Sequence, residues 1–245
     1  MCPTIDSAYR QNRSLVILAF VVSEGRFMMS TEPRNDSVRL VGGFLALLLV
    51  GCGSNASVPS LQSASQNATQ NQSILTPLNK GKHFVVSSTT FKDNTKVPQS
   101  MVFNGSGSGC TGGNKSPQLS WSKTPAGTRS YTVLMFDVTA SFTHWGMYNI
   151  PASTTSLPEN AGTAGSPDGQ QILNDFGIGQ QYDGPCPPPG PAHHYVITVF
   201  ALDCTLTLPS PLGKFPPFPE TLLYALIEAG DDILGTAQIT GLYST

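Results

Sequence analysis

The sequence has little charge. Lysine, arginine, aspartate and glutamate make up only 11% of the 245 residues, and the formal net charge is -2. A surface so poor in cations has no broad basic patch for a polyanion, so the composition argues against nucleic-acid binding. An anionic ligand would therefore have to be held locally, by a few side chains and backbone groups.

The sequence also lacks the short motifs of common catalytic sites. It contains no Gly-x-Ser-x-Gly nucleophile elbow, no P-loop and no His-Glu-x-x-His zinc motif. A zinc site could be assembled from Asp137, His144, Cys186 and His193, but their spacing matches no standard metal motif. We expect no enzymatic activity, no metal and no cofactor.

The N-terminal part has the pattern of an export signal. Arg34 and Arg39 precede an apolar run, Val41 to Val50, which is followed by Gly51 and Cys52. The run is about half the length of the ~20 apolar residues that a membrane-spanning helix needs. A basic flank followed by a short apolar run is typical of a secretory signal. This one resembles a bacterial lipoprotein signal, which would make Cys52 the lipidated N-terminus of the mature chain.

Residues 1–52 are thus predicted to be a signal region, with Met28 or Met29 as the true start because a further apolar run lies upstream of them. Residues 53–82 are rich in Ser, Asn and Gln and have almost no large apolar residue. Such a segment cannot bury enough surface to offset its ordering entropy, so we expect a flexible tether. The predicted location is the bacterial cell envelope, with a lipid anchor on the periplasmic side or at the surface.

Residues 83–245 are predicted to form one mostly β domain. Runs of β-branched and aromatic residues of strand length recur between loops rich in Gly, Pro, Asn and Ser. The stretch 219–230 instead has helical spacing, with Pro near its start and Gly at its end. The pattern predicts two packed sheets with a short helix near the C-terminus. The expected strands are 84–91, 130–138, 144–150, 194–203 and 234–243.

Three cysteines would remain beside Cys52 after export. Cys110 and Cys186 lie in glycine-rich loops, whereas Cys204 ends an apolar run and is predicted to be a buried free thiol. In an oxidising compartment two of the three are expected to pair. The favoured pair is Cys110 with Cys186, and the alternative is that all three are packing residues.

Strand alternation sorts the polar residues of the last strands. If the chain from His193 onward is a strand, His193 and Tyr195 point to one face and His194 to the other. At most one of the two adjacent histidines can therefore share a site with Tyr195.

The same alternation places Asp137 and His144 at strand edges. Asp137 ends an apolar strand, and His144 is expected to share its face with Gly146 and Tyr148. Taken singly, an aspartate at a strand end is usually a turn residue, and a histidine on a strand is usually a hydrogen-bonded packing residue. Their joint position beside glycine-containing loops is harder to explain as packing alone.

Four segments resemble one known family in their order and spacing. They are 110–121, 143–151, 182–195 and 201–209. They are similar to the bacterial branch of the phosphatidylethanolamine-binding proteins, also called Raf kinase inhibitor-like proteins, over essentially all of residues 83–245. The resemblance implies a sandwich of two antiparallel sheets with a small pocket for phosphate and other anionic head groups.

The resemblance also implies which residues form that pocket. The predicted ligand-binding residues are Asp137, His144, Gly184, Pro185, His193 and Tyr195. The function implied is that of a lipid-anchored binding protein for a small anionic ligand or a phospholipid head group. The alternative is a protein-interaction module, a protease or signalling inhibitor that presents the pocket rim to a protein partner.

Two departures from the family pattern concern the ligand. The family's Asp-Pro-Asp-Ala-Pro reads Asp-Val-Thr-Ala-Ser at residues 137–141, and its C-terminal Gly-His pair is replaced by Gly230 and Asp231. Because imidazoles bind phosphate better when protonated, phosphate affinity is predicted to rise as pH falls from about 8 to 6.

Overall fold

The structure is a computed structural model that describes residues 84–105, 109–209 and 216–245. The predicted signal of residues 1–52, with its lipidated Cys52 and its start at Met28 or Met29, lies outside these ranges. The predicted tether of residues 53–82 does so too. In the three ranges described, no helix is both long enough and apolar enough to cross a membrane.

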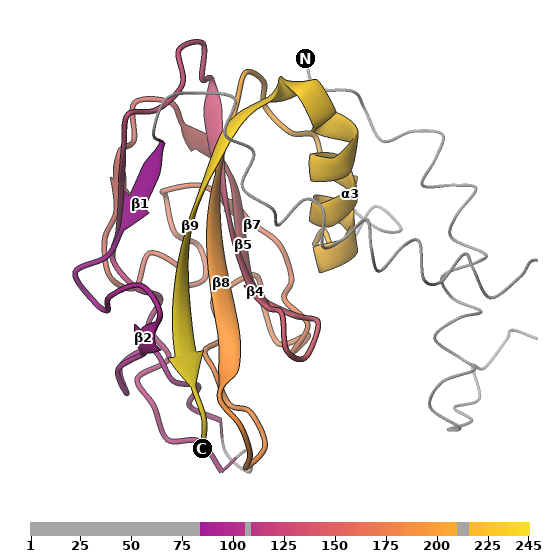
Figure 1. Cartoon of the computed structure of the whole chain (residues 1–245). Coiled ribbons are helices and arrows are strands. Elements are labelled where there is room, and N and C mark those ends of the chain that lie inside the picture. The colour runs from indigo at the N-terminus through magenta and orange to yellow at the C-terminus, as the bar shows by residue number, and fades with distance from the viewer. Residues whose placement is uncertain (1–83, 106–108, 210–215) are drawn as a thin grey trace, which may run out of the picture. The chain divides into compact units, whose positions relative to one another are not determined.

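The domain is a sandwich of two sheets (Figure 1). The strands are β1 (Val85–Ser87), β2 (Thr95–Lys96), β3 (Leu119–Ser122), β4 (Ser130–Asp137), β5 (Phe142–Pro151), β6 (Ser156–Leu157), β7 (Gln170–Gln171), β8 (His193–Leu202) and β9 (Ile233–Tyr243). The larger sheet has the order β2-β9-β8-β4-β5-β7, and the smaller one has the order β1-β3-β6. Neighbouring strands are antiparallel, except that β2 runs parallel to β9.

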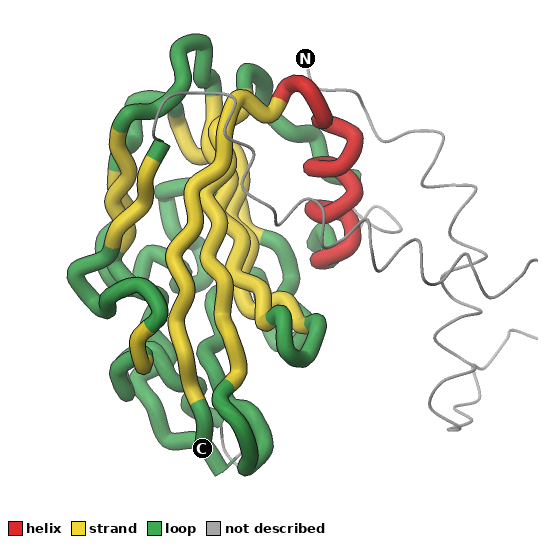
Figure 2. The backbone as a smooth tube through the Cα atoms, viewed as in Figure 1, coloured by secondary structure: helices red, strands yellow, loops and turns green. Residues whose placement is uncertain are grey.

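The predicted fold class is confirmed. The runs expected at 130–138, 194–203 and 234–243 are β4, β8 and β9, within one residue at each end. The expected helix is α3 (Pro219–Ala229), which is followed by the 3-10 turn η2 (Gly230–Asp232). Figure 2 shows this helix on one side of the strands. The first predicted strand is shorter than expected, because only Val85–Ser87 pair with β3.

Both faces of the larger sheet are buried, which explains the nearly continuous apolar runs in its strands. Between the sheets lies a cluster that includes Trp121, Tyr131, Trp145 and Ile197. On the other face, α3 covers a second cluster. It contains Leu134 and Phe200 from β4 and β8, and Leu222 and Leu226 from α3. The helix places leucine or alanine at 222, 225, 226 and 229, the spacing of one apolar face.

A β-bulge in β5 decides where His144 points. Met135 pairs with Trp145 and Phe136 pairs with Thr143, so His144 has no partner on β4. Gly146 faces the helix side, where a Cβ would lie 2.5 Å from the side chain of Ile172. The imidazole of His144 instead lies 5.1 Å from the ring of Tyr195, which belongs to the cluster between the sheets. The prediction that His144 shares its face with Gly146 and Tyr148 is therefore wrong, because the extra residue reverses the alternation.

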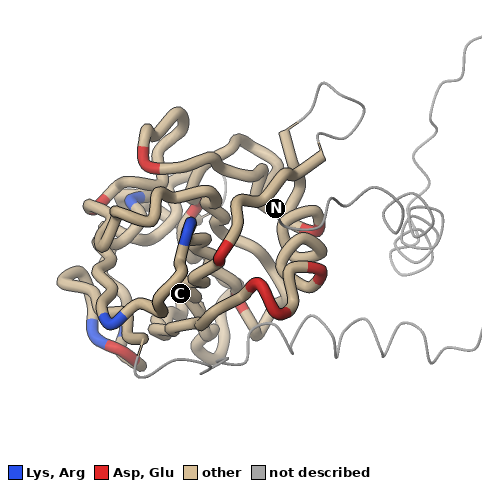
Figure 3. Tube along the Cα trace, turned by 90° about the horizontal axis from the view of Figure 1, so that it is seen from above, with Lys and Arg blue, Asp and Glu red and all other residues tan. Residues whose placement is uncertain are grey.

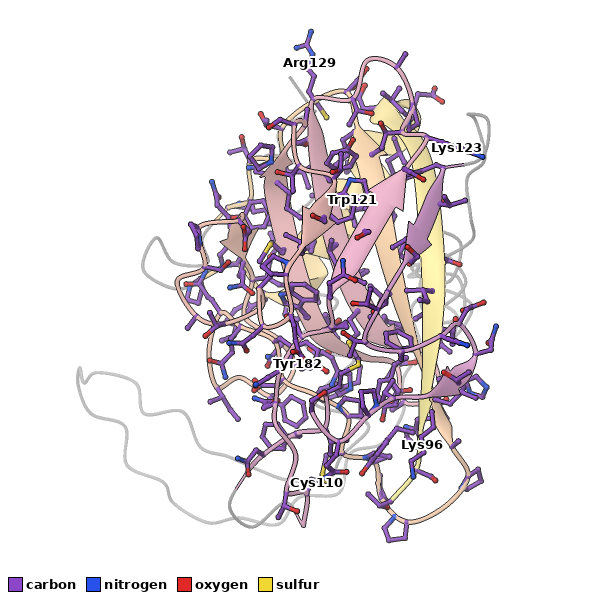
Figure 4. All side chains as sticks on the ribbon, turned by 90° about the vertical axis from the view of Figure 1, so that its left-hand side faces the viewer. Lys96, Cys110, Trp121, Lys123, Arg129 and Tyr182 are labelled. Atoms are coloured by element: carbon purple, nitrogen blue, oxygen red, sulfur yellow. A yellow bond between two sulfur atoms is a disulfide. The ribbon has the colours of Figure 1, made fainter. Side chains whose placement is uncertain are left out.

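A disulfide joins Cys110 to Cys186, the pair favoured from the sequence. Their Cα atoms are 5.9 Å apart, and 76 residues separate them along the chain. Cys110 lies at the end of the domain opposite Lys123 and Arg129 (Figure 4). Cys204 is buried as expected, but it too is disulfide-bonded, which corrects the prediction of a free thiol.

Candidate ligand-binding site

Strand pairing brings Asp137 and the His193–Tyr195 segment together. Asp137, the last residue of β4, lies opposite Tyr195 of β8. His193 lies two residues earlier on the same face of β8, and its ring stacks near that of Tyr195 at 6.3 Å between centroids. Asp137 and Tyr195 are only 2% and 1% exposed, so the carboxylate is a buried group and not a solvated turn residue. His194 is exposed, as the predicted alternation requires.

The carboxylate of Asp137 is fully engaged by donors. Its Oδ2 is 2.6 Å from Nδ1 of His193, and its Oδ1 accepts hydrogen bonds from the backbone N–H groups of Thr139 and Ala140, at 2.8 and 3.1 Å. These bonds offset the cost of burying a charge. Because an ionised carboxylate can only accept, Nδ1 of His193 carries the proton. The ring nitrogen of His193 left for a ligand is therefore Nε2.

His144 is held in the same way by a backbone carbonyl. Its Nδ1 donates to the carbonyl oxygen of Asp183 at 2.8 Å, since a carbonyl can only accept. Burial lowers the pKa of His144 below 6.5, outweighing the opposite effects of the Asp183 backbone and of the charges on Asp137 and Asp183. The Gly184 backbone adds a further, smaller upward effect on this pKa. At neutral pH the imidazole is thus neutral, and its Nε2 is a hydrogen-bond acceptor.

Aromatic rings account for the burial of His144. Phe142, Phe176 and Tyr195 lie around it, with ring centroids 5.0, 5.5 and 5.1 Å from the imidazole. Phe103 extends this group by stacking on Phe176 at 4.7 Å. Phe103, Phe142 and Phe176 could not be identified from the sequence, because isolated aromatic residues in a β protein are usually core residues.

Tyr195 keeps its proton at any pH near neutral. Burial raises the pKa of its phenol far above the ordinary value of 10.0, and the charge of Asp137 and a hydrogen bond with it raise the pKa further. The hydroxyl is therefore a neutral group that can take part in hydrogen bonding beside Asp137.

Asp183 is a second buried carboxylate, which was not predicted from the sequence. It is 1% exposed and accepts hydrogen bonds from the side-chain amides of Asn114, Asn174 and Gln181, at 2.9, 2.7 and 3.0 Å. Its backbone N–H also donates to the carbonyl of His144. Asp183 thus joins the loop before β3 to its own β7–β8 loop, and its backbone joins this loop to β5 and holds the His144 ring. An acid in a loop rich in Gly and Pro is usually solvated, so the sequence carried no signal for this role.

The predicted ligand-binding residues Gly184 and Pro185 directly follow Asp183 in the sequence. We call them the Gly184–Pro185 wall. The N–H of Gly184 donates to Oδ1 of Asn114, and the carbonyl of Pro185 accepts from the N–H of Phe103. A Cβ at residue 184 would lie 1.8 Å from the carbonyl oxygen of Met101, so only glycine fits there. The Cys110–Cys186 disulfide fixes the next residue of the same loop. This is a rigid wall, in line with its proline content.

Cations contribute little to the site. Lysines and arginines are few and scattered on the described chain (Figure 3). Lys96 of β2 lies over the ring of Tyr243, 5.6 Å from its centroid, and Tyr243 pairs with His193 across β8 and β9. Lys96 is therefore a cation at the margin of the site, at the same end of the domain as Cys110 (Figure 4).

A separate shallow groove of about 520 Å³ lies elsewhere, lined in part by Thr89, Gln118 and Glu159. None of the six predicted site residues lines it. Its polar side chains hydrogen-bond one another, for example Thr89 with Gln118, and it has no imidazole or cation. We therefore place the candidate site at the histidine pair and not at this groove.

Comparisons with known proteins agree with the observed fold. The family model of the phosphatidylethanolamine-binding proteins matches residues 87–244. YbhB of Escherichia coli is 42% identical over 123 residues, which cover 47% of this chain and 76% of that protein. The crystal structure of YbcL of Escherichia coli, described as a new member of the mammalian PEBP family, is 36% identical with a TM-score of 0.58. The structural match covers 66% of this chain and 98% of the YbcL chain.

A third relative extends beyond the folded domain. It is the Mycobacterium tuberculosis protein named "Putative lipoprotein LppC", 29% identical over 191 residues, which cover 74% of this chain and 86% of that protein. From the family model and the similarity to YbhB, the chain belongs to the phosphatidylethanolamine-binding protein family.

Proposed function

We propose that this protein is an exported, lipid-anchored binding protein whose pocket holds phosphate or phospholipid head groups. One observation carries the proposal: His144 and His193 converge on Tyr195, and each uses Nδ1 for an internal hydrogen bond, which leaves Nε2 for a ligand. Two imidazoles of this kind can contact the oxygens of one small oxyanion.

The two acidic residues near the imidazoles are compatible with an anionic ligand, because donors of the protein already bind both carboxylates. The negative charge of Asp137 is already bound by His193 and two backbone N–H groups. The charge of Asp183 is bound by three amides. Lys96 adds a positive charge at the margin. A bound oxyanion therefore meets carboxylates that are already neutralised by donors.

The proposed anchor rests on the lipoprotein-like pattern that ends at Cys52 and on one relative. Residues 84–245 are 162 of 245 residues, about 66%, whereas the similarity to LppC covers 74% of this chain. It therefore includes residues upstream of the folded domain, and the relative's name calls it a lipoprotein. This supports a lipid-anchored protein of the bacterial envelope with residues 53–82 as the tether.

The proposal is tested by calorimetric titration of the full-length protein with O-phosphorylethanolamine. We expect saturable 1:1 binding that His144→Ala abolishes. His194→Ala is the matched control, because it removes an exposed imidazole from the opposite face of the same strand as His193. Absence of binding by the unmodified protein would contradict the proposal, as would equal loss of affinity in both variants.

We also propose that the protein is not an enzyme. The hydrogen bonds of the imidazoles join them to Asp137 and to the Asp183 carbonyl, not to a nucleophile. Turnover of a phosphomonoester or an ester substrate that is lost in His193→Ala would contradict this part of the proposal.

A second candidate function is binding of a protein partner at the pocket rim. Val138 and Ile178 are large apolar side chains that are 37% and 63% exposed. Val138 follows Asp137 directly, and Ile178 lies two residues after Phe176, whose ring contacts His144. If the rim binds a protein, replacing both residues by serine removes partner binding but leaves the affinity for O-phosphorylethanolamine unchanged.

A further inference from the structure

The hydrogen bonds of His144 determine which kind of oxyanion the pocket can accept. Nδ1 is used by the carbonyl of Asp183, so the neutral ring can only accept a hydrogen bond at Nε2. The ring is 4% exposed and enclosed by Phe142, Phe176 and Tyr195, so it cannot turn to exchange its nitrogens without breaking the bond to Asp183. The tautomer is therefore fixed by the backbone and not by the ligand.

The charged and titratable groups around His144 come from three elements. Asp137 lies on β4, His193 and Tyr195 lie on β8, and Asp183 lies in the loop before β8. Both carboxylates favour the charged imidazole, but burial among aromatic rings outweighs them. An acceptor nitrogen thus faces the ligand at neutral pH.

Oxyanions differ in whether they carry a proton that they can donate to such an acceptor. Inorganic phosphate keeps at least one P–OH group throughout the neutral range, so one of its oxygens can donate. Sulfate has nearly the same size and charge but carries no proton at these pH values. A sulfate oxygen placed against Nε2 would put two acceptors together, and a buried acceptor without a donor is costly.

We propose that this pocket selects oxyanions that carry their own proton, and that it binds hydrogen phosphate while discriminating against sulfate through Nε2 of His144. The inference rests on the proposed function, because it concerns the same pocket. It also predicts how organic ligands bind: a phosphomonoester, whose second pKa is about 6, binds as the monoanion that keeps a P–OH, and a head group without a P–OH must supply an ammonium N–H. A site built to hydrogen-bond a ligand proton rejects ligands that lack it far more strongly than shape alone does.

The test compares inorganic phosphate and sulfate by calorimetry on the full-length protein at about pH 7.5 and equal ionic strength. We expect phosphate to bind at least about tenfold more tightly than sulfate. As pH falls below the lowered pKa of His144 and the ring gains a proton, Nε2 becomes a donor and the ratio should decrease. Equal affinities at the higher pH would overturn the inference but leave the proposed function intact. Absence of binding by both anions would overturn both.

Two further measurements locate the effect. His144→Gln is expected to reduce the phosphate-to-sulfate ratio to less than about threefold, because the glutamine amide can turn its NH₂ toward the anion. His194→Gln, the matched control, should keep the ratio of the unmodified protein. Independently of any variant, ¹⁵N NMR of the ligand-free protein should show His144 protonated at Nδ1 and unprotonated at Nε2. A proton on Nε2 of the neutral ring would overturn the inference.

Discussion

At the residue scale, the candidate site consists of side chains that form hydrogen bonds inside the protein with only some of their polar atoms. Nδ1 of each imidazole serves the protein, and both oxygens of Asp137 are engaged by donors. The atoms left over, Nε2 of His144 and Nε2 of His193, are those that can recognise a ligand. Such internal bonds preorganise the site, so little conformational freedom has to be lost on binding.

Asp183→Asn tests the carboxylate that holds the loops. Asparagine keeps one acceptor oxygen but turns an NH₂ group toward amide donors that now bond a carboxylate. We expect the free energy of unfolding to fall by about 1–3 kcal/mol, measured by urea denaturation. Glu159→Gln removes the same charge from an exposed side chain and should change it by no more than about 0.5 kcal/mol. Equal effects of the two variants would contradict the role given to Asp183.

The buried His144 should make stability depend on pH. Burial holds the pKa of His144 below 6.5, so between that lowered value and 6.5 the unfolded chain binds a proton that the folded chain does not. The free energy of unfolding therefore decreases as pH falls below 6.5, by up to about 1.4 kcal/mol per pH unit for this group.

His144→Gln should remove this part of the pH dependence, as measured by urea denaturation between about pH 5 and 7. In His194→Gln the slope of the unmodified protein should persist. An unchanged slope in His144→Gln would contradict the assignment of this pH dependence to His144.

Residue positions could be predicted from the sequence where alternation is regular. The shared face of His193 and Tyr195 and the exposure of His194 follow from the two-residue period of a strand. His144 could not be placed this way, because the bulge beside it adds one residue to β5. Asp183 could not be identified either, since its partner Asn114 is 69 residues away and its bond to Asn174 depends on how the β7–β8 loop folds.

At the element scale, the long central strands and the helix can be predicted from their local sequence, whereas the short strands at the sheet edges cannot. β4, β8, β9 and α3 have continuous apolar patterns that fix their type. The two-residue strands β2, β6 and β7 carry no pattern of their own and form only because a long strand or β3 offers a partner edge. The parallel pairing of β2 with β9 is likewise a property of the assembled sheet.

The larger sheet contains a matched pair of buried threonines. Thr132 of β4 and Thr198 of β8 are both fully buried. The hydroxyl of Thr132 has no hydrogen-bond partner, whereas that of Thr198 accepts a bond from the side-chain amide of Gln238. An unpaired buried hydroxyl destabilises a protein, but a paired one does not.

Thr132→Val should therefore raise the free energy of unfolding by about 1 kcal/mol. Thr198→Val should lower it by a similar amount, because the hydrogen bond from the side-chain amide of Gln238 is lost. Both values come from urea denaturation of the full-length protein. If the two substitutions change stability in the same direction, the assignment of the unpaired hydroxyl is wrong.

At the scale of the whole molecule, the chain closes a long loop at the site. The Cys110–Cys186 disulfide spans 76 residues, which include β3 to β7. It also holds the Gly184–Pro185 wall near the loop that ends at Cys110. The disulfide therefore stabilises both the fold and the Gly184–Pro185 wall of the proposed pocket.

Replacing both cysteines by alanine should lower the free energy of unfolding by about 4.5 kcal/mol, from the loop-closure entropy of a 76-residue separation. Thermal and urea denaturation of the double variant measure the change. Because the Gly184–Pro185 wall would then lack its covalent restraint, the affinity of the protein for O-phosphorylethanolamine should also decrease. A double variant as stable as the parent would show that the disulfide constrains neither.

The central claim is that His144 and His193 together contact a phosphate-bearing ligand. The most direct measurement is ¹H–¹³C NMR of the histidine rings of the full-length protein, which has 4 histidines, during titration with O-phosphorylethanolamine. The account predicts that the ring signals of His144 and His193 shift together along one saturable curve, while that of His194 stays in place. If the signals of His144 and His193 do not move at saturating ligand, or if only His194 responds, the claim is contradicted.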